Sequence, residues 1–147
     1  LEDEEDGSVR CAACLALGQI KDPSAVPALM DLLKNEKYWY VRRDAIKALG
    51  KLQDPRASSE IYKKADDIYD EVREVVKTAL LSIGKPAAPE IIKLFLRNPK
   101  DSALNSFVTT KFTREEFIAQ LHNLVSTETN ESQKKLYQMY LDKLNQQ

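Results

Sequence analysis

The sequence is poor in the residues on which most protein chemistry depends. Its 147 residues include one histidine, His122, and two cysteines, Cys11 and Cys14. A zinc site built on both cysteines would need two further ligands, and two cysteines this close together cannot form a disulfide framework. Neither a glycine-rich phosphate loop nor a nucleophile beside a base is visible. We therefore expect no catalytic residues, no metal and no cofactor.

Glycine and long apolar runs are also scarce. Only four glycines and few β-branched alternations argue against sheet structure. No apolar run approaches the roughly 20 residues that span a bilayer, and no signal-peptide pattern opens the sequence. The 22 basic and 23 acidic residues nearly cancel, whereas a general nucleic-acid binder concentrates positive charge. These features predict a cytoplasmic, all-helical domain with neither a membrane nor a nucleic acid as its partner.

What the sequence does contain is a repeat of about 32 residues. A Val-Arg dipeptide recurs 32 and then 31 residues further on, as Val9-Arg10, Val41-Arg42 and Val72-Arg73. Two more motifs recur after 32 residues, Ala16-Leu17-Gly18 as Ala48-Leu49-Gly50 and Asp22-Pro23 as Asp54-Pro55. In the third copy Leu81 stands where the others have glycine, and Lys85-Pro86 replaces Asp-Pro.

Each copy predicts a helix that buries one apolar stripe, because its apolar residues recur at helical spacing. The stripes are Val9, Ala13, Ala16, Leu17 and Ile20; Val41, Ala45, Ala48, Leu49 and Leu52; and Val72, Val76, Ala79, Leu80 and Ile83. Asp22 and Asp54 are placed to cap a second helix that has proline at its first position. In the middle copy this second helix is weak, since small or charged residues replace larger apolar ones.

One such helix pair cannot bury its stripe alone, so we predict an α-solenoid of about three stacked helical hairpins, at 7–34, 38–65 and 69–96. The repeats occupy 1–99, and 100–147 forms a helical cap packed on the last hairpin. Within the cap we expect a loop with a short helix near 103–108, a capping box at Thr113 and Glu116, and a helix opened by Asn130. Residues 1–6 resemble the loop after an earlier repeat helix, so we expect the C-terminal part of a longer protein.

The repeat pattern V-R-x-x-A-x-x-A-L-G-x-I-x-D-P-x-A-V-P-x-L resembles the HEAT-like repeats of phycobilisome lyase subunits and of many other proteins. The resemblance covers residues 7–96. That family includes scaffolds, regulators and a few enzymes, so the resemblance implies a superhelical fold more sharply than a function. It also implies that the arginines of the Val-Arg pairs contact Asp22 and Asp54 of neighbouring turns.

In proteins of this pattern, the positions outside the stripe on the Val-Arg helices line the concave face. Carried over to this chain, the resemblance implies a partner-binding surface of Trp39, Tyr40, Arg43, Asp44, Lys47 and Lys51, flanked by Cys11, Ala12, Leu15 and Gln19 and by Asp70, Glu71, Glu74 and Thr78. Tryptophan, tyrosine and arginine often anchor interfaces, although Trp39 could instead pack against a neighbouring loop. The mixed charge suits a protein or peptide better than a small molecule or a phosphate backbone.

The C-x-x-C spacing of Cys11 and Cys14 is typical of redox centres and of half a zinc site. A redox pair follows a strand and begins a helix, where the helix dipole lowers the thiol pKa. Here Val9 and Arg10 precede the pair within the same helix. We predict two small helix residues instead, with Cys11 facing solvent and open to reaction, and Cys14 at an intermediate position.

The leading hypothesis is therefore a non-enzymatic scaffold that binds a protein or peptide on the concave face of a short HEAT-like solenoid. One alternative is a bilin-lyase-like subunit acting on a tetrapyrrole, with Trp39, Tyr40 and Cys11 lining a chromophore groove. A remoter alternative is a HEAT-like DNA-binding or glycosylase module, which the acidic third repeat disfavours. A HEAT-like di-iron hydroxylase needs repeated His-Glu pairs, which a single histidine excludes.

Overall fold

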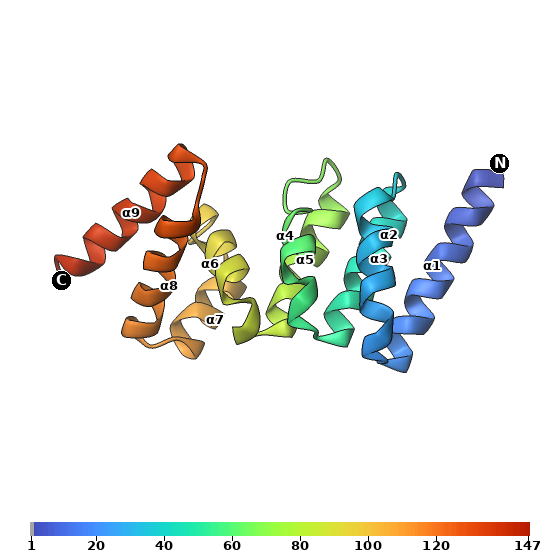
Figure 1. Ribbon diagram of the computed structural model, residues 1–147, viewed down its shortest axis with the longest axis horizontal. Helices are drawn as coiled ribbons and strands as arrows, with labels where there is room; N and C mark the ends of the chain where they lie inside the picture. Colours follow the sequence, from blue (N-terminus) through green and yellow to red (C-terminus); the bar gives the residue numbers. More distant parts are fainter. Residues whose placement is uncertain (1) are drawn as a thin grey trace. The chain divides into compact units, whose positions relative to one another are not determined.

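The chain is α-helical in a computed structural model that describes residues 2–147, with side chains from Glu5 onward (Figure 1). Within that range there is no β-strand, so the predicted all-α class is confirmed. No helix among the described residues is both long enough and apolar enough to cross a bilayer. The chain divides into two compact units, the first running to Glu90 and the second spanning Ile91–Gln147.

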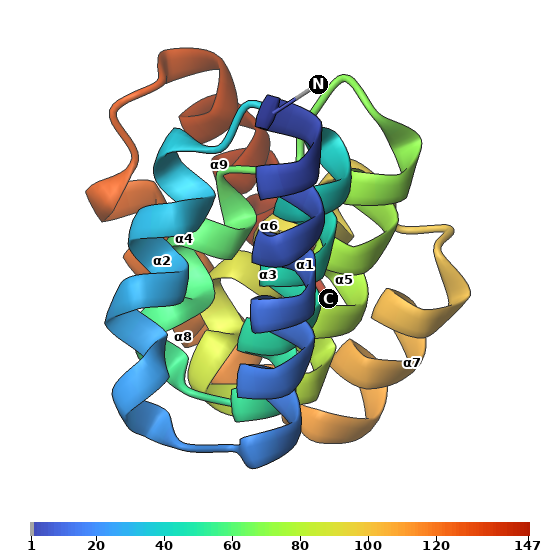
Figure 2. The same ribbon diagram turned by 90° about the vertical axis from the view of Figure 1, so that its right-hand side faces the viewer.

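The first unit is a two-layer stack of helical hairpins, as the repeat predicts. Its helices are α1 (Glu2–Ile20), α2 (Val26–Asn35), α3 (Trp39–Leu52), α4 (Ser58–Tyr62) and α5 (Asp70–Ile83). Helix α3 packs between α1 and α5, while α2 and α4 contact one another and pack on α3 and α5 respectively. In Figure 2, α2 and α4 lie on one side of the layer formed by α1, α3 and α5. This arrangement is the predicted HEAT-like solenoid.

The predicted aspartate caps are present, but each begins a single 3-10 turn before the second helix. The Asp22 carboxylate accepts a hydrogen bond from the Ser24 N–H, and Asp54 accepts one from the Arg56 N–H. The turns are η1 (Pro23–Ala25) and η2 (Pro55–Ala57), and a third, η3 (Lys85–Ala87), follows α5. The middle second helix, α4, has only five residues, which agrees with its weak apolar pattern.

The shared glycines let the helices of one layer approach closely. A Cβ atom added to Gly18 would lie 3.1 Å from the Ala48 Cα, and one added to Gly50 would lie 2.9 Å from the Ala79 Cα. Gly18 and Gly50 occupy the same repeat position, and so do Ala48 and Ala79. The glycine of the Ala-Leu-Gly motif therefore permits a close contact between helix backbones that recurs from one repeat to the next.

The stripe predicted for α1 is not buried, unlike those of α3 and α5. Val9 and Ile20 are 68% and 69% exposed, whereas Val41 and Val72 are fully buried. In α3 and α5 the stripe is covered by the preceding hairpin, and no helix of the described chain lies in that place beside α1. The α1 residues that are buried are instead those facing α3, namely Gly7, Cys14 and Gly18.

The second unit is a smaller helical assembly with its own core. It contains most of α6 (Ala88–Arg97), together with α7 (Ser102–Lys111), α8 (Arg114–Thr127) and α9 (Glu131–Asn145). Its core cluster consists of Ile92, Leu96, Leu121, Leu124, Tyr137 and Leu141. Leu121 and Leu124 come from α8, and Tyr137 and Leu141 come from α9. That this unit caps the last repeat stays a prediction.

The helix starts in the second unit follow the predicted caps. The Thr113 side chain accepts from the Glu116 N–H, and the Glu116 carboxylate accepts from the Thr113 N–H, so the capping box is complete. Asn130 caps α9 through a bond from the Gln133 N–H. Helix α7 is capped by the Asp101 carboxylate, which accepts two backbone N–H groups, and it is longer than predicted at both ends, chiefly beyond Val108, where it continues to Lys111.

Candidate partner-binding surface

Helix α3 presents one narrow stripe of accessible side chains on the solvent side of the layer. Four-residue spacing places Trp39, Arg43, Lys47 and Lys51 along this stripe; the two lysines are exposed and the other two are partly buried. We call the solvent side of α1, α3 and α5 the α1–α3–α5 face. Asp44 was predicted to belong to it but is buried, since its carboxylate turns to the neighbouring Arg43 and accepts a 2.8 Å bond from Nε.

The N-terminal end of the stripe is an aromatic cluster. The Trp39 ring stacks on Tyr69 at 5.6 Å between centroids and meets Tyr40 edge-on at 5.9 Å. The Arg43 guanidinium lies 5.3 Å from the Trp39 ring centroid. Tyr69 immediately precedes α5, so Trp39 does contact a neighbouring loop, as the alternative interpretation held. Because Trp39 stays only partly buried, this packing holds the indole in place while leaving some of its surface accessible.

The arginines of the Val-Arg pairs do not contact Asp22 and Asp54, so that prediction is wrong. Arg10 donates a hydrogen bond of 2.7 Å from Nε to the Glu36 carboxylate, and Arg42 donates two, of 2.8 and 2.9 Å, to the Asp67 carboxylate. Glu36 and Asp67 lie in the segments that lead into the next repeat, directly before α3 and α5. Asp22 and Asp54 are occupied as helix caps. Arg10 and Arg42 therefore tie α1 and α3 each to the loop that follows its own hairpin, whereas Arg73 of α5 is ion-paired with Asp70.

The surroundings of the Asp67 and Glu36 carboxylates favour their charged forms. Burial would raise the pKa of Asp67, but the hydrogen bonds from Arg42 and from the Tyr69 N–H outweigh it and hold the pKa below the usual value. Burial would also raise the pKa of Glu36. The hydrogen bonds from Arg10 and from the Tyr38 N–H outweigh this effect, so the pKa of Glu36 is lowered as well. Charge-assisted bonds of this kind stabilise the ionised form.

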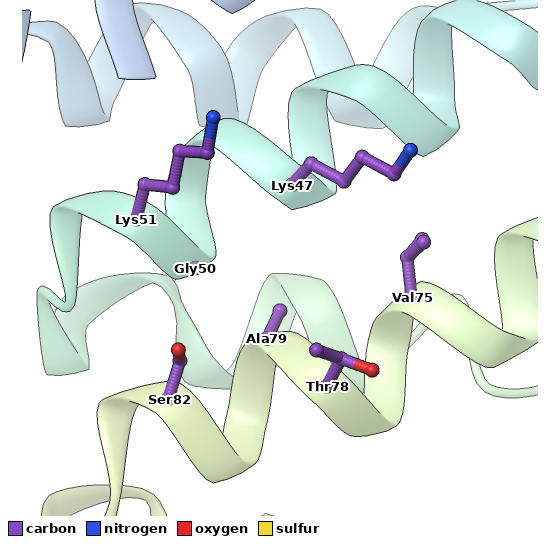
Figure 3. A pocket seen from close by; sticks show the side chains of 7 residues that line it. All are labelled: Lys47, Gly50, Lys51, Val75, Thr78, Ala79 and Ser82. Atoms are coloured by element: carbon purple, nitrogen blue, oxygen red, sulfur yellow. The ribbon is translucent and has the colours of Figure 1, made fainter. Parts of the chain in front are cut away.

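A groove lies between α3 and α5 beside the C-terminal end of the stripe (Figure 3). It has a volume of about 320 Å³ and is lined by Lys47, Gly50, Lys51, Val75, Thr78, Ala79 and Ser82. Gly50 and Ala79 contribute no side chain beyond Cβ, which leaves the space between the helices open. The surface prediction omitted Gly50, Val75, Ala79 and Ser82. The sequence feature that could have located the groove is the glycine of the repeat motif, because this glycine marks where the backbones of two helices meet.

Residues 1–81 match the family described as HEAT repeats, which is 81 of the 147 residues. The chain belongs to the HEAT-repeat family. HEAT repeats commonly serve as protein-interaction scaffolds, because stacked hairpins create extended surfaces. The match covers the helices that carry the stripe, the aromatic cluster and most of the groove.

The flanking residues predicted for the surface of the HEAT repeats differ in their environments. Leu15 and Gln19 of α1 are exposed, and so are Asp70, Glu71 and Glu74 of α5. Asp70 is ion-paired with Arg73, and Glu74 lies 3.8 Å from the Lys77 Nζ. The α1–α3–α5 face thus holds an acidic group on the N-terminal half of α5, where Glu71 lies near Arg43 of α3.

The two cysteines of the first HEAT hairpin are less accessible than predicted. Cys14 is buried, and Cys11 is partly buried rather than solvent-facing. Burial, followed by the hydrogen bond to Asp44, raises the pKa of Cys11 to about 11. Burial also raises the pKa of Cys14 to about 11. Because the thiolate is the reactive form, this environment suppresses cysteine chemistry at neutral pH.

Proposed function

We propose that this chain is a non-enzymatic scaffold that binds a protein or peptide on the α1–α3–α5 face of its HEAT repeats. The observation that carries the proposal is the accessible Trp39–Arg43 pair, held by the stack on Tyr69. The few residues that dominate the binding energy of an interface are enriched in tryptophan, tyrosine and arginine. A pair that is already ordered loses little side-chain entropy when a partner binds.

The surrounding surface supports the same proposal. Lys47 and Lys51 continue the stripe from the aromatic cluster toward the groove, while acidic side chains of α5 flank it. A folded partner or a peptide can match such a mixed pattern with charges of its own. Complementary charge of this kind adds chiefly to specificity and to the rate of association.

The test uses twelve-residue peptides selected on the wild-type chain from a random display library and then labelled with fluorescein. The double variant Trp39→Phe with Arg43→Gln retains a ring against Tyr69 and a donor for Asp44. We expect fluorescence anisotropy to show at least about tenfold weaker binding, since central interface residues are each worth about 1–2 kcal/mol. The matched control is Arg56→Ala, which removes an exposed arginine from η2. Peptides that bind the double variant as tightly as the wild type would place the surface elsewhere.

The resemblance to phycobilisome lyase subunits supplies the second candidate, action on a tetrapyrrole. Its predicted chromophore groove includes Cys11, whose raised pKa leaves the thiol protonated at neutral pH. Mixing the chain with free bilin tests this candidate, because a bound chromophore changes its visible absorbance.

The cytoplasmic location expected from the sequence also remains a proposal, to be tested by imaging the tagged full-length protein.

A further inference from the structure

We propose that the groove between α3 and α5 binds an acidic peptide segment. An apolar side chain of the segment enters the groove, and carboxylates beside it pair with Lys47 and Lys51. This inference rests on the proposed function, because it names the chemistry of a partner for the same face. It concerns a second contact on that face, at the C-terminal half of α3, separate from the aromatic cluster.

The first argument is an imbalance of charge across the groove. The positive charge of Arg43 is balanced within the chain, because Asp44 accepts a hydrogen bond from it and the negative charge of Glu71 on α5 lies nearby. Further along α5, the residues beside Lys47 and Lys51 are Val75, Thr78 and Ser82, none of which is acidic. Among the side chains that the structure describes, neither lysine has an ion-pair partner. Two cations four residues apart are therefore left for carboxylates from outside the chain.

The second argument is the shape and lining of the groove. Its volume of about 320 Å³ lies at the lower end of the range for ligand pockets, enough for part of a peptide. The floor is formed by Gly50 and Ala79, and Val75 adds an apolar wall. Figure 3 shows Val75 and Ser82 pointing from α5 toward α3, with Lys47 and Lys51 along the opposite side. An apolar side chain can enter while its neighbours reach the lysines.

The third argument concerns the polar groups that remain available to a peptide backbone. Ser82 is exposed and lines the groove. Its backbone oxygen accepts a 2.9 Å bond from the Gln53 side chain, which ties the end of α3 to α5. The Ser82 hydroxyl can donate to a carbonyl of the bound segment. The groove thus combines an apolar floor, two cations and a hydroxyl donor.

The same arrangement disfavours a nucleic acid on this face. A phosphate backbone would follow the lysines past Glu71 and Glu74, which are exposed and negatively charged. A short peptide can place its carboxylates at the lysines only and keep neutral residues elsewhere. Like charges facing each other are a common means of excluding a wrong partner.

The probe is a fluorescein-labelled twelve-residue peptide in which two leucines are flanked by glutamates, added to the full chain. We expect binding by fluorescence anisotropy that weakens about tenfold in Lys47→Gln with Lys51→Gln, as two partly desolvated ion pairs are lost. The matched control is Lys34→Gln with Lys63→Gln, which removes the same charge from the exposed lysines near Glu60. Val75→Glu supplies an internal carboxylate beside Lys47 and should also weaken binding about tenfold.

Two altered peptides test the two contacts separately. Replacing the leucines by serine should abolish binding if the apolar side chain fills the groove. Replacing the glutamates by lysine should abolish it if the carboxylates pair with α3. Equal binding of either altered peptide, or equal losses in the variant pair and its control, would overturn the proposal.

Amide chemical shifts separate this inference from the proposed function. We expect the peptide to shift the NMR signals of Gly50, Thr78 and Ser82 more than those of the aromatic cluster. Shifts confined to Trp39 and Arg43 would overturn the groove assignment while supporting the proposed function. A peptide that does not bind at millimolar concentration would overturn the groove assignment alone, because the display-selected peptides test the face independently.

Discussion

Gly50 of α3 lies against Ala79 of α5 so closely that a Cβ atom on the glycine would be 2.9 Å from both the Cα and the Cβ of the alanine. The same contact occurs one repeat earlier between Gly18 and Ala48. At both places the contact is between helices of one layer, and the Gly50–Ala79 contact also forms the floor of the groove. The glycine of the repeat thus sets the spacing of the helices that carry the candidate surface.

Gly50→Ala should therefore destabilise the fold even though alanine favours helix. Alanine gains about 1 kcal/mol in helix propensity over glycine, whereas overpacking against a backbone costs about 1–3 kcal/mol. We expect a net loss of about 1 kcal/mol in the free energy of unfolding, measured by urea denaturation. Gly18→Ala is the matched control, because its closest contact is longer, at 3.1 Å. A Gly50→Ala protein that is more stable than the wild type would contradict this account.

Removing the Arg42 side chain should cost far more than removing an exposed arginine. Arg42 and Asp67 are nearly buried and joined by two hydrogen bonds, and Arg42 also donates to the Lys37 carbonyl at 2.8 Å. Breaking such a pair leaves a buried charge without a partner, which costs about 3–5 kcal/mol. We expect Arg42→Ala to lower the melting temperature strongly or to unfold the first unit. Arg56→Ala, at an exposed ion pair with Asp54, should leave the melting temperature unchanged.

Stability should fall as the pH drops through the acidic range. The folded-state pKa of Asp67 is lowered, so its stabilising contribution is fully present above the unfolded pKa of about 4 and is lost as the pH falls through the lower folded value. Glu36 acts in the same direction. Urea midpoints measured between pH 7 and pH 3 test this. Asp67→Asn should start less stable and show a shallower decline, and a slope equal to that of the wild type would exclude Asp67 as a source.

Both thiols should react slowly with iodoacetamide in the folded chain. With pKa values raised to about 11, Cys11 and Cys14 hold little thiolate at pH 8. We expect mass spectrometry to show alkylation that is much slower in buffer than in urea. Asp44→Asn should speed the reaction of Cys11, because Asp44 is a cause of its raised pKa, second to burial. Rapid alkylation of the native wild type would instead support the prediction that Cys11 is open to reaction.

Local features of this fold were predictable because their signals lie within one helix or one turn. Helical spacing of apolar residues predicts the stripes of α3 and α5, and the aspartates before the prolines predict the caps. The capping box at Thr113 needs only residues three apart and formed as expected. The end of α7 was misplaced, since its segment has no strong apolar stripe along which the helix could be followed beyond Val108.

The sequence by itself determined the repeat, the helices, their caps and the glycines that mark close approach. Tertiary structure alone decided the partners of Arg10 and Arg42, because the acids that hold them lie 26 and 25 residues away in loops that only stacking brings near. It also decided that the stripe of α1 stays exposed and that a groove opens beside Lys47 and Lys51. Burial and charge pairing depend on which helix packs alongside, and no single repeat carries that information.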